Sequence, residues 1–244
     1  MKNGEIQVSN YAVILAGGTG SRMGNVDKPK QFIEVYGKPI IAYTLETFSM
    51  HMEIDKIIIV TLKEWQDDVR ALIRKFELSK VVAVLTGGDT RQQSVYEAIK
   101  YLKDFASSDD IVVVHDAVRP LVSQKIISEN IRVAKQHGAV DTAIPSADTI
   151  VHTQDMENIK TIPNRDQYFL GQTPQTFHYS ILQRAHEVAM QKDTVETTDD
   201  CKLILQLGHP VKITLGDKLN FKITTFEDLS LFKALIKLGK IEVI

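Results

Sequence analysis

The stretch YAVILAGGTGSRMGNVDKPKQF, residues 11–32, is the most informative part of this sequence. It opens with a short apolar run that is typical of a buried strand. The run leads directly into a loop that contains Gly17, Gly18 and Gly20. Glycine allows successive backbone N–H groups to converge on an anion. The stretch therefore predicts a strand followed by a phosphate-binding loop.

Two cations follow the glycines, and two familiar glycine motifs are excluded. Arg22 and Lys30 would neutralise the charge that develops as a diphosphate departs. The Walker motif is absent because no Gly-Lys-Ser/Thr completes it, and the dinucleotide fingerprint fails because Met23 follows where a third glycine is required. These residues favour a bound triphosphate over a plain glycine turn with solvated cations, and Lys28 is expected to face solvent.

Outward from this stretch, strand-like and helix-like segments alternate. Continuous apolar runs, typical of strands covered on both faces, occur at 56–61, 81–85, 111–115 and 139–144. Amphipathic segments of helical length lie between them or beside them, at 39–48, 63–76, 92–102 and 123–137. The alternation predicts an α/β fold, a Rossmann-like doubly wound sheet that is mostly parallel.

The alternation stops after Pro145. Residues 148–171 hold short β-like pieces and no long helical period, which predicts a protruding β-arm. Further on, helical patterns cover 179–190, 198–207 and about 226–238, while VKITL and NFKIT resemble strands. With no repeat or low-complexity linker, residues 1–244 are expected to form a single domain.

A second glycine-containing segment, TGGDTRQQS, follows the strand predicted at 81–85. It contains Gly87, Gly88, Asp89, Arg91 and Ser94. In open α/β sheets the ligand binds at the carboxyl ends of the strands, so this segment would flank the base and ribose of a nucleotide. An ordinary glycine turn before a helix remains the alternative.

The segment VVVHDAVRP places His115, Asp116 and Arg119 at the end of another strand. A carboxylate at that edge can hold Mg²⁺ between phosphates, and an arginine can meet an anionic substrate. Asp116 is therefore the candidate metal ligand. The alternative is an ion pair between Asp116 and Arg119, and His115 is expected to be a core residue rather than a catalytic base.

The composition limits the partners of this chain. The 29 Lys and Arg residues nearly balance the 31 Asp and Glu residues, which argues against nucleic acid or an anionic membrane as a partner. Cys201 is the single cysteine, so an intramolecular disulfide and a thiolate-rich zinc site are excluded. No signal peptide or membrane-length apolar run occurs, and we expect a cytoplasmic protein.

The second half carries scattered polar residues that suit a phosphate. Thr149, Arg165, Thr173 and Lys222 would make a phosphate clamp if the fold brought them together, because charge-assisted hydrogen bonds hold phosphate well. The acidic tract TVETTDDCK stands where a helix should begin, and acids are favoured there by the helix dipole. Capping is the preferred interpretation of that tract.

Taken together, these motifs resemble the IspD-like cytidylyltransferases. LAGGTGSRMG, PKQF, GGDTRQQS, HDAVRP, DT, GQTPQTF and NFKIT occur in the family's order and near its spacing, from residue 11 to the last helix. The resemblance implies an enzyme that joins CTP to a small polyol phosphate, releases pyrophosphate and uses Mg²⁺ near Asp116. It also implies a homodimer in which the β-arm of one chain reaches the site of the other.

The resemblance assigns roles residue by residue. Nucleotide binding falls to Ala16, Gly17, Gly18, Gly20, Gly88, Asp89 and Ser94. Catalysis falls to Arg22, Lys30 and Lys222. Binding of the polyol phosphate falls to Asp116, Arg119, Thr173 and Lys222 of one chain, completed by Thr149 and Arg165 of the other.

Within the family, three details favour D-ribitol 5-phosphate, giving CDP-ribitol for teichoic acid or a related polymer. These are AGG at 16–18, the stretch from IPNR to GQTPQTF, and DDCK in a late helix. The entry to the arm, AIPSADT, is closer to the alternative, the 2-C-methyl-D-erythritol 4-phosphate enzymes of isoprenoid synthesis. A nucleotide-sugar-dependent glycosyltransferase and a non-catalytic nucleotide-binding regulator rank lower, because no Asp-x-Asp triplet ends a strand and the cations occur together.

Overall fold

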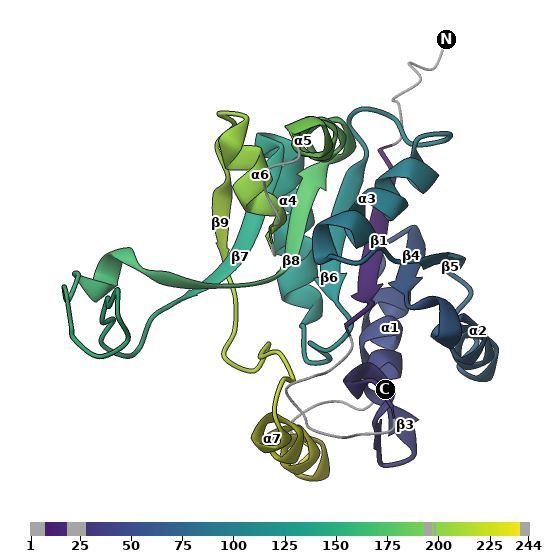
Figure 1. The fold of residues 1–244 in the computed structure, drawn as a ribbon. Helices are drawn as coiled ribbons and strands as arrows, with labels where there is room; N and C mark the ends of the chain where they lie inside the picture. The colour runs from purple at the N-terminus through teal and green to yellow at the C-terminus, as the bar shows by residue number, and fades with distance from the viewer. Residues whose placement is uncertain (1–7, 19–27, 193–196, 198, 240–244) are drawn as a thin grey trace.

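A computed structural model describes residues 8–18, 28–192, 197 and 199–239. Within them, seven strands form one sheet in the order β5-β4-β1-β6-β8-β7-β9 (Figure 1). The strands are β1 (Asn10–Ala16), β4 (Lys56–Thr61), β5 (Val81–Thr86), β6 (Ile111–Asp116), β7 (Ala139–Pro145), β8 (Phe169–His178) and β9 (Lys212–Leu215). The predicted Rossmann-like α/β sheet is confirmed.

The parallel half of the sheet consists of β5, β4, β1 and β6. β1 runs through its middle, with Leu15 aligned to Val60 on one side and Asp116 on the other. Because parallel strands end at the same edge, the loops after β1, β5 and β6 gather there. That edge brings the glycine loop and Asp116 together.

The second half of the sheet contains a strand of opposite direction. β8 pairs antiparallel with both β6 and β7, and β9 adds in parallel at the outer edge of β7. Val114 and Asp141 both align with Gln175, so these three residues lie side by side across β6, β8 and β7. β8 thereby carries residues of the GQTPQTF segment to the edge where Asp116 lies.

Helices cover both faces of the sheet (Figure 1). The helices are α1 (Ile40–Met50), α2 (Gln66–Lys75), α3 (Arg91–Leu102), α4 (Gln124–His137), α5 (Tyr179–Lys192), α6 (Asp200–Gln206) and α7 (Phe226–Lys237). One apolar core lies between the sheet and α1, α2 and α4, and a second lies between the sheet and α3, α5 and α6. Burial on both faces explains why the parallel strands are continuously apolar.

α7 packs away from the main sheet, against α1 and the small hairpin of β2 (Glu34–Val35) and β3 (Lys38–Pro39). The segment NFKIT, which precedes α7, was predicted to be a strand, and that prediction is wrong. Its Asn220 amide donates to the Thr173 carbonyl at 2.8 Å and to Gln172 Oε1 at 3.1 Å. Hydrogen bonds from the Asn220 side chain to β8 therefore hold this segment in place of the backbone hydrogen bonds of a strand.

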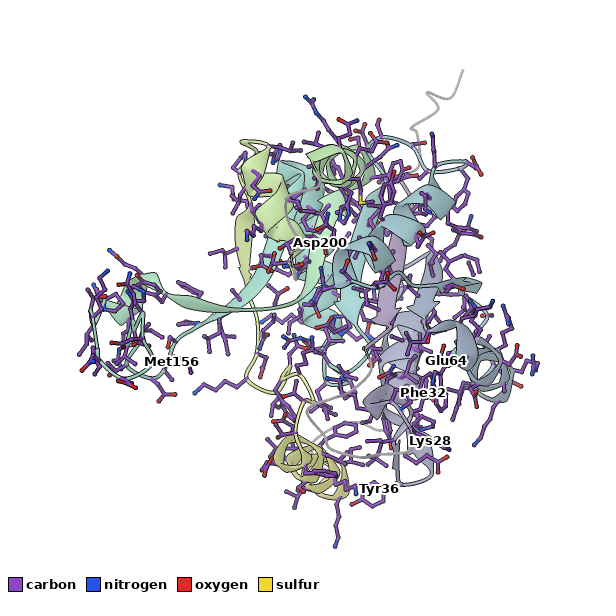
Figure 2. The ribbon with its side chains drawn as sticks, in the orientation of Figure 1. Lys28, Phe32, Tyr36, Glu64, Met156 and Asp200 are labelled. Atoms are coloured by element: carbon purple, nitrogen blue, oxygen red, sulfur yellow. The ribbon has the colours of Figure 1, made fainter. Side chains whose placement is uncertain are left out.

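Residues 146–168, between β7 and β8, extend away from the body of the molecule (Figure 1). A single bridge between His152 and Thr161 and the short η4 (Arg165–Gln167) are the regular structure described within them. Met156 lies on this arm and is 91% exposed (Figure 2). Among the described residues, no helix combines the length and apolar character needed to span a membrane.

Candidate active site

A cavity of about 360 Å³ opens at the edge where the parallel strands end. Its walls come from the loops after β1, β5 and β6, from the start of α3, and from the segment before α7. The lining residues are Leu15, Ala16, Gly17, Gly18, Lys30, Gln31, Gly88, Asp89, Thr90, Arg91, Ser94, Asp116, Val118 and Lys222. Nine residues to which the sequence analysis gave roles thus line one cavity: Ala16, Gly17, Gly18, Lys30, Gly88, Asp89, Ser94, Asp116 and Lys222.

The start of the glycine loop is held by Gln31, a residue without a predicted role. Its buried amide nitrogen donates to the carbonyls of Ala16 at 2.6 Å and Gly18 at 3.0 Å. Gln31 stands in the short η2 (Lys30–Phe32), so the same turn also places Lys30 at the cavity. The PKQF motif was the available signal for Gln31. Gly20 and Arg22 lie outside the described residues, and Lys28 is exposed, as expected.

The turn before α3 depends on glycine for close packing. A Cβ on Gly87 would lie 2.7 Å from Ser94 Oγ, and a Cβ on Gly88 would lie 2.3 Å from Cβ of Gln93. Thr90 caps α3 in a capping box with Gln93. The turn can therefore approach the first turn of the helix closely, which leaves Ser94 and the helix N-terminus beside the cavity.

Asp116 is surrounded by cations. Its Oδ2 lies 3.0 Å from Lys222 Nζ and 3.6 Å from Arg119 Nε. Burial alone raises the pKa of Asp116, but the positive charges of Lys222, Arg91 and Arg119 outweigh burial and hold this pKa well below its usual range. The alternative ion pair between Asp116 and Arg119 is thus present, together with a closer one to Lys222. Asp116 stays ionised at neutral pH.

Arg119 does not line the cavity itself. Its NH1 donates to the carbonyl of Asn220 at 2.8 Å, and its buried Nε has no hydrogen-bond partner among the described residues. Together with the bonds from Asn220 to β8, this contact attaches the segment around Lys222 to the end of β6. Arg119 therefore supports the position of Lys222 from behind the cavity.

His115 and Thr173 form a chain of hydrogen bonds that ends at the backbone N–H of Asp116. Nε2 of His115 lies 3.1 Å from the Arg119 carbonyl, which can only accept, so Nε2 carries the proton. The Thr173 hydroxyl, 3.0 Å from Nδ1, then donates to His115 and accepts from the backbone N–H of Asp116 at 3.1 Å. Burial lowers the pKa of His115 to about 4. His115 is a neutral core residue, as predicted.

These hydrogen bonds of Thr173 are relevant to the phosphate-binding role that was predicted for it. Thr173 is buried and is not among the residues that line the cavity. Its single hydroxyl proton points to His115, so its oxygen supports the backbone of Asp116. Binding of the polyol phosphate by Thr173 remains a prediction.

The two arm residues with predicted roles lie apart from the cavity. Thr149 is exposed, and Arg165 is 57% exposed in its side chain. The guanidinium of Arg165 donates to the Ala147 carbonyl at 3.1 Å and approaches Asp166 at 3.9 Å. Within one chain the fold does not bring Thr149 or Arg165 to Asp116, so their part in a site shared between two chains stays a prediction.

Arg91 lines the cavity, although the sequence predicted only its place after the third strand and no role for it. It begins α3 and reaches Asp200 Oδ2 at 2.6 Å and Gln175 Oε1 at 3.2 Å. Asp200 belongs to the acidic tract for which capping was predicted, and its neighbour Asp199 does cap α6 by accepting from the N–H groups of Cys201 and Lys202. The contact between Arg91 and Asp200 spans 109 positions, and no local pattern signals it.

The donors at the cavity fit a magnesium ion that is held mainly by the substrate. No cluster of three or more His, Cys, Asp or Glu side chains suited to a metal occurs among the described residues. Asp116 and Asp89 are the carboxylates that line the cavity. Mg²⁺ commonly takes one or two carboxylates and completes its shell with phosphates and water. Asp116 would supply one such ligand, and its binding of a metal remains a prediction.

Comparisons with known proteins agree with this geometry. The sequence model of a family described as "IspD: 2-C-methyl-D-erythritol 4-phosphate cytidylyltransferase" matches residues 10–238. A solved 4-diphosphocytidyl-2C-methyl-D-erythritol synthase from Anaerococcus prevotii is 31% identical, with 94% of this chain and 96% of that chain covered and a TM-score of 0.82.

Two solved 2-C-methyl-D-erythritol 4-phosphate cytidylyltransferases are also similar. The Francisella tularensis protein is 29% identical, with 93% of this chain and 99% of that chain covered and a TM-score of 0.78. For the Thermus thermophilus protein the identity is 29%, the coverage is 92% and 98%, and the TM-score is 0.73. The similarity therefore extends over nearly the whole of each chain.

Proposed function

Because this chain belongs to the IspD family of cytidylyltransferases, we propose that it joins CTP to 2-C-methyl-D-erythritol 4-phosphate and releases pyrophosphate. The family makes the chain a CTP-dependent nucleotidyltransferase, and the second substrate is the proposed part. The three solved relatives described above are named for this substrate or its cytidylylated product. Those names favour it over the ribitol 5-phosphate that the sequence analysis preferred.

The observation that carries the proposal is that cations and the start of the glycine loop line one cavity with Asp116. Lys222 lies far in the sequence from Gly17, Gly18 and Lys30, yet all four residues line one cavity with Asp116. Such a set suits a reaction in which two phosphates must approach one another. Positive charge at that place offsets the repulsion between the phosphates and stabilises the charge of the transition state.

The proposed reaction needs positioning more than acid–base chemistry. A phosphate oxygen of the second substrate, already ionised at neutral pH, attacks the α-phosphorus of CTP. A new P–O bond forms as the bond between the α-phosphorus and the bridging oxygen breaks, and pyrophosphate leaves with the electron pair. His115 is not suited to act as a base, because both ring nitrogens are already hydrogen-bonded and the ring is buried. Positioning of this kind accounts for a large part of catalysis.

We assign Lys30 to the phosphates of CTP and Lys222 to the phosphate of the second substrate. Lys222 holds the nearer ion pair to Asp116 and is 36% exposed, so its ammonium group can contact a ligand as well as the carboxylate. Mg²⁺ bound at Asp116 would screen the triphosphate and polarise the α-phosphate. The protein's own part is to hold Asp116 ionised, which Lys222, Arg91 and Arg119 achieve.

Ribitol 5-phosphate is the second candidate. Gln175 of GQTPQTF and Asp200 of DDCK, which belong to two of the sequence details that pointed to ribitol, lie together in the fold. Both bond to Arg91, which lines the cavity. A difference between subfamilies at these positions would therefore reach the substrates through Arg91.

We propose that the arm completes the site of a second copy of the chain. The arm exposes apolar side chains that the single chain leaves uncovered, among them Val151, Met156, Ile159 and Ile162. Covering such a surface stabilises an assembly. Thr149 and Arg165 stand on the same arm and would reach the partner's cavity with it.

Pyrophosphate release from CTP and Mg²⁺ tests the proposal. The purified protein is assayed with 2-C-methyl-D-erythritol 4-phosphate and ribitol 5-phosphate in parallel, and kcat/KM is measured for each. We expect faster turnover of the methylerythritol substrate. Faster turnover of ribitol 5-phosphate would transfer the assignment to the second candidate, and turnover of neither would overturn both substrates. The Asp116→Asn variant controls for contaminating activity.

A further inference from the structure

Arg91 separates the cavity from a buried polar cluster that we call the Arg91 cluster: Arg91, Gln175, His186 and Asp200. Arg91 lines the cavity, whereas the other three residues do not. Its NH1 donates to Asp200 Oδ2 at 2.6 Å, and its NH2 donates to Gln175 Oε1 at 3.2 Å. Both terminal nitrogens of the guanidinium are therefore held from the side away from the cavity.

Both carboxylate oxygens and the backbone N–H of Asp200 are hydrogen-bonded. Its second oxygen, Oδ1, lies 2.9 Å from His186 Nε2, and since a carboxylate only accepts, Nε2 carries the proton. The backbone N–H of Asp200 donates to Gln175 Oε1 at 3.3 Å. The side chains of Asp200 and His186 are both fully buried, and the His186 ring stacks on Tyr96 with centroids 6.4 Å apart.

The cluster joins elements that are distant in the sequence. Arg91 opens α3, Gln175 lies on β8, His186 lies on α5, and Asp200 opens α6. Figure 2 shows Asp200 in the body of the molecule, away from the arm. A rearrangement of α6 would therefore move the guanidinium of Arg91 at the cavity.

Stability alone is a poor explanation for this ion pair. Removing two charges from water is costly, so a buried pair contributes little net stability compared with apolar packing. The exposure is also uneven, because the Arg91 side chain is 17% exposed and that of Asp200 is 0% exposed. Arg91 is the member of the pair whose side chain is partly exposed, and it lines the cavity.

The position of Arg91 points the same way. Arg91 lines the same cavity as Asp116 and Lys222. Arg91 therefore lies near the place where the reacting phosphates would meet. A guanidinium held by two acceptors keeps a fixed direction, which favours bonds to phosphate oxygens.

We propose that Asp200 is a positioning residue that holds Arg91 against the phosphates of the bound nucleotide, and that His186 fixes Asp200 in that role. The inference rests on the proposed function only in taking CTP as the ligand. Asp200 and His186 act through Arg91 and do not touch the nucleotide. No step of the reaction passes through them.

Calorimetric titration with CTP and Mg²⁺, without the second substrate, tests this inference. The proteins compared are the wild type, Arg91→Lys, Asp200→Asn, the double variant and His186→Phe, each with its Tm measured. Lysine keeps the charge of Arg91 but cannot bridge two acceptors, asparagine keeps the shape of Asp200, and phenylalanine keeps the ring beside Tyr96. Glu46→Gln is the matched control, because it breaks the partly buried ion pair with Lys38 outside the cavity.

We expect Arg91→Lys and Asp200→Asn each to raise the Kd of CTP by ~10-fold or more, the scale of a charge-assisted hydrogen bond. The double variant should be no weaker than the weaker single variant, because Asp200 acts through Arg91. His186→Phe should raise the Kd by roughly threefold, as expected for the loss of one supporting hydrogen bond, and Glu46→Gln should leave it unchanged.

An unchanged Kd in Asp200→Asn, or multiplying effects in the double variant, would overturn the inference and leave Asp200 as a stabilising residue only. If Asp200→Asn does not fold, an unchanged Kd in His186→Phe would overturn it instead. Wild-type protein that binds CTP but turns over neither polyol phosphate contradicts the proposed substrates alone. Wild-type protein that does not bind CTP contradicts both proposals.

Discussion

Lys222 Nζ lies 3.0 Å from Asp116 Oδ2, which joins the segment before α7 to the end of β6. The two residues are 106 positions apart in the chain. The pair leaves Lys222 partly exposed at the cavity, so the same ammonium group can bind a substrate phosphate. Because Lys222 is the first of the charges that lower the pKa of Asp116, its removal should affect both binding and the carboxylate.

We predict that Lys222→Ala lowers kcat/KM by ~100-fold or more, the scale of a lost electrostatic contact in the transition state. The Tm should fall as well, because the buried Asp116 carboxylate loses its nearest cation. Steady-state pyrophosphate release measures the effect, and Lys218→Ala, which removes an exposed lysine of the same segment, serves as the control. Equal losses in the two variants would show a general charge effect instead of a specific role.

Lys30→Ala should lower turnover by ~10²-fold with the fold intact, since Lys30 lines the cavity beside the glycine loop. Lys28 is exposed and two positions away, so Lys28→Ala is the matched control and should keep near-normal turnover. Circular dichroism checks that both variants are folded. Near-normal turnover of Lys30→Ala would refute the assignment of Lys30 to the phosphates.

Replacing Thr173 tests its hydrogen bonds to His115 and to the backbone of Asp116. Thr173→Val keeps the shape but leaves Nδ1 of His115 and the backbone N–H of Asp116 without partners, which should cost about 1–3 kcal/mol of stability. We expect a lower Tm and a lower kcat, with full rescue by Thr173→Ser, which restores the hydroxyl. If Thr173→Val raises only the KM of the second substrate at an unchanged Tm, Thr173 binds that substrate directly.

Stability should fall below pH 6.5 because of His115. Burial lowers its pKa to about 4, whereas the unfolded chain binds the proton near 6.5. Above pH 6.5 the imidazole is neutral in both states. As the pH falls to 4, only the unfolded state is protonated, and about 3 kcal/mol of stability is lost.

Denaturant unfolding of wild type and His115→Gln between pH 4 and pH 8 measures this effect. The difference in unfolding free energy between the two proteins should change with pH in the window from 6.5 to 4, since glutamine does not titrate. A constant difference across that window would contradict the prediction. The NMR titration of the His115 ring reports its pKa directly.

Arg165→Ala should raise the KM of the second substrate more than the Kd of CTP, because the arm is assigned to the polyol phosphate of a partner chain. The side chain is exposed, so folding should be unaffected. Lys160→Ala removes another exposed cation of the arm and should have little effect. Equal weakening of both substrates by Arg165→Ala would argue against the assignment.

The parallel strands and the location of the cavity follow from local patterns. Continuous apolar runs predicted parallel strands, and parallel strands end at one edge, so Gly17, Gly88 and Asp116 had to converge. The structure places all three at the cavity. Asp116 ends its strand, and Gly17 and Gly88 follow theirs within two residues, which is why the sequence alone could locate them.

Contacts between distant segments were decided only by tertiary structure. NFKIT has a strand-like composition, yet side-chain bonds from Asn220 to β8 hold it in an irregular path. His115 meets Thr173 because β8 runs antiparallel beside β6. Arg91 meets Asp200 because the first residues of α3 and α6 lie side by side. A sequence pattern reports the period of one element, whereas these pairs depend on how separate elements pack, so only the fold could reveal them.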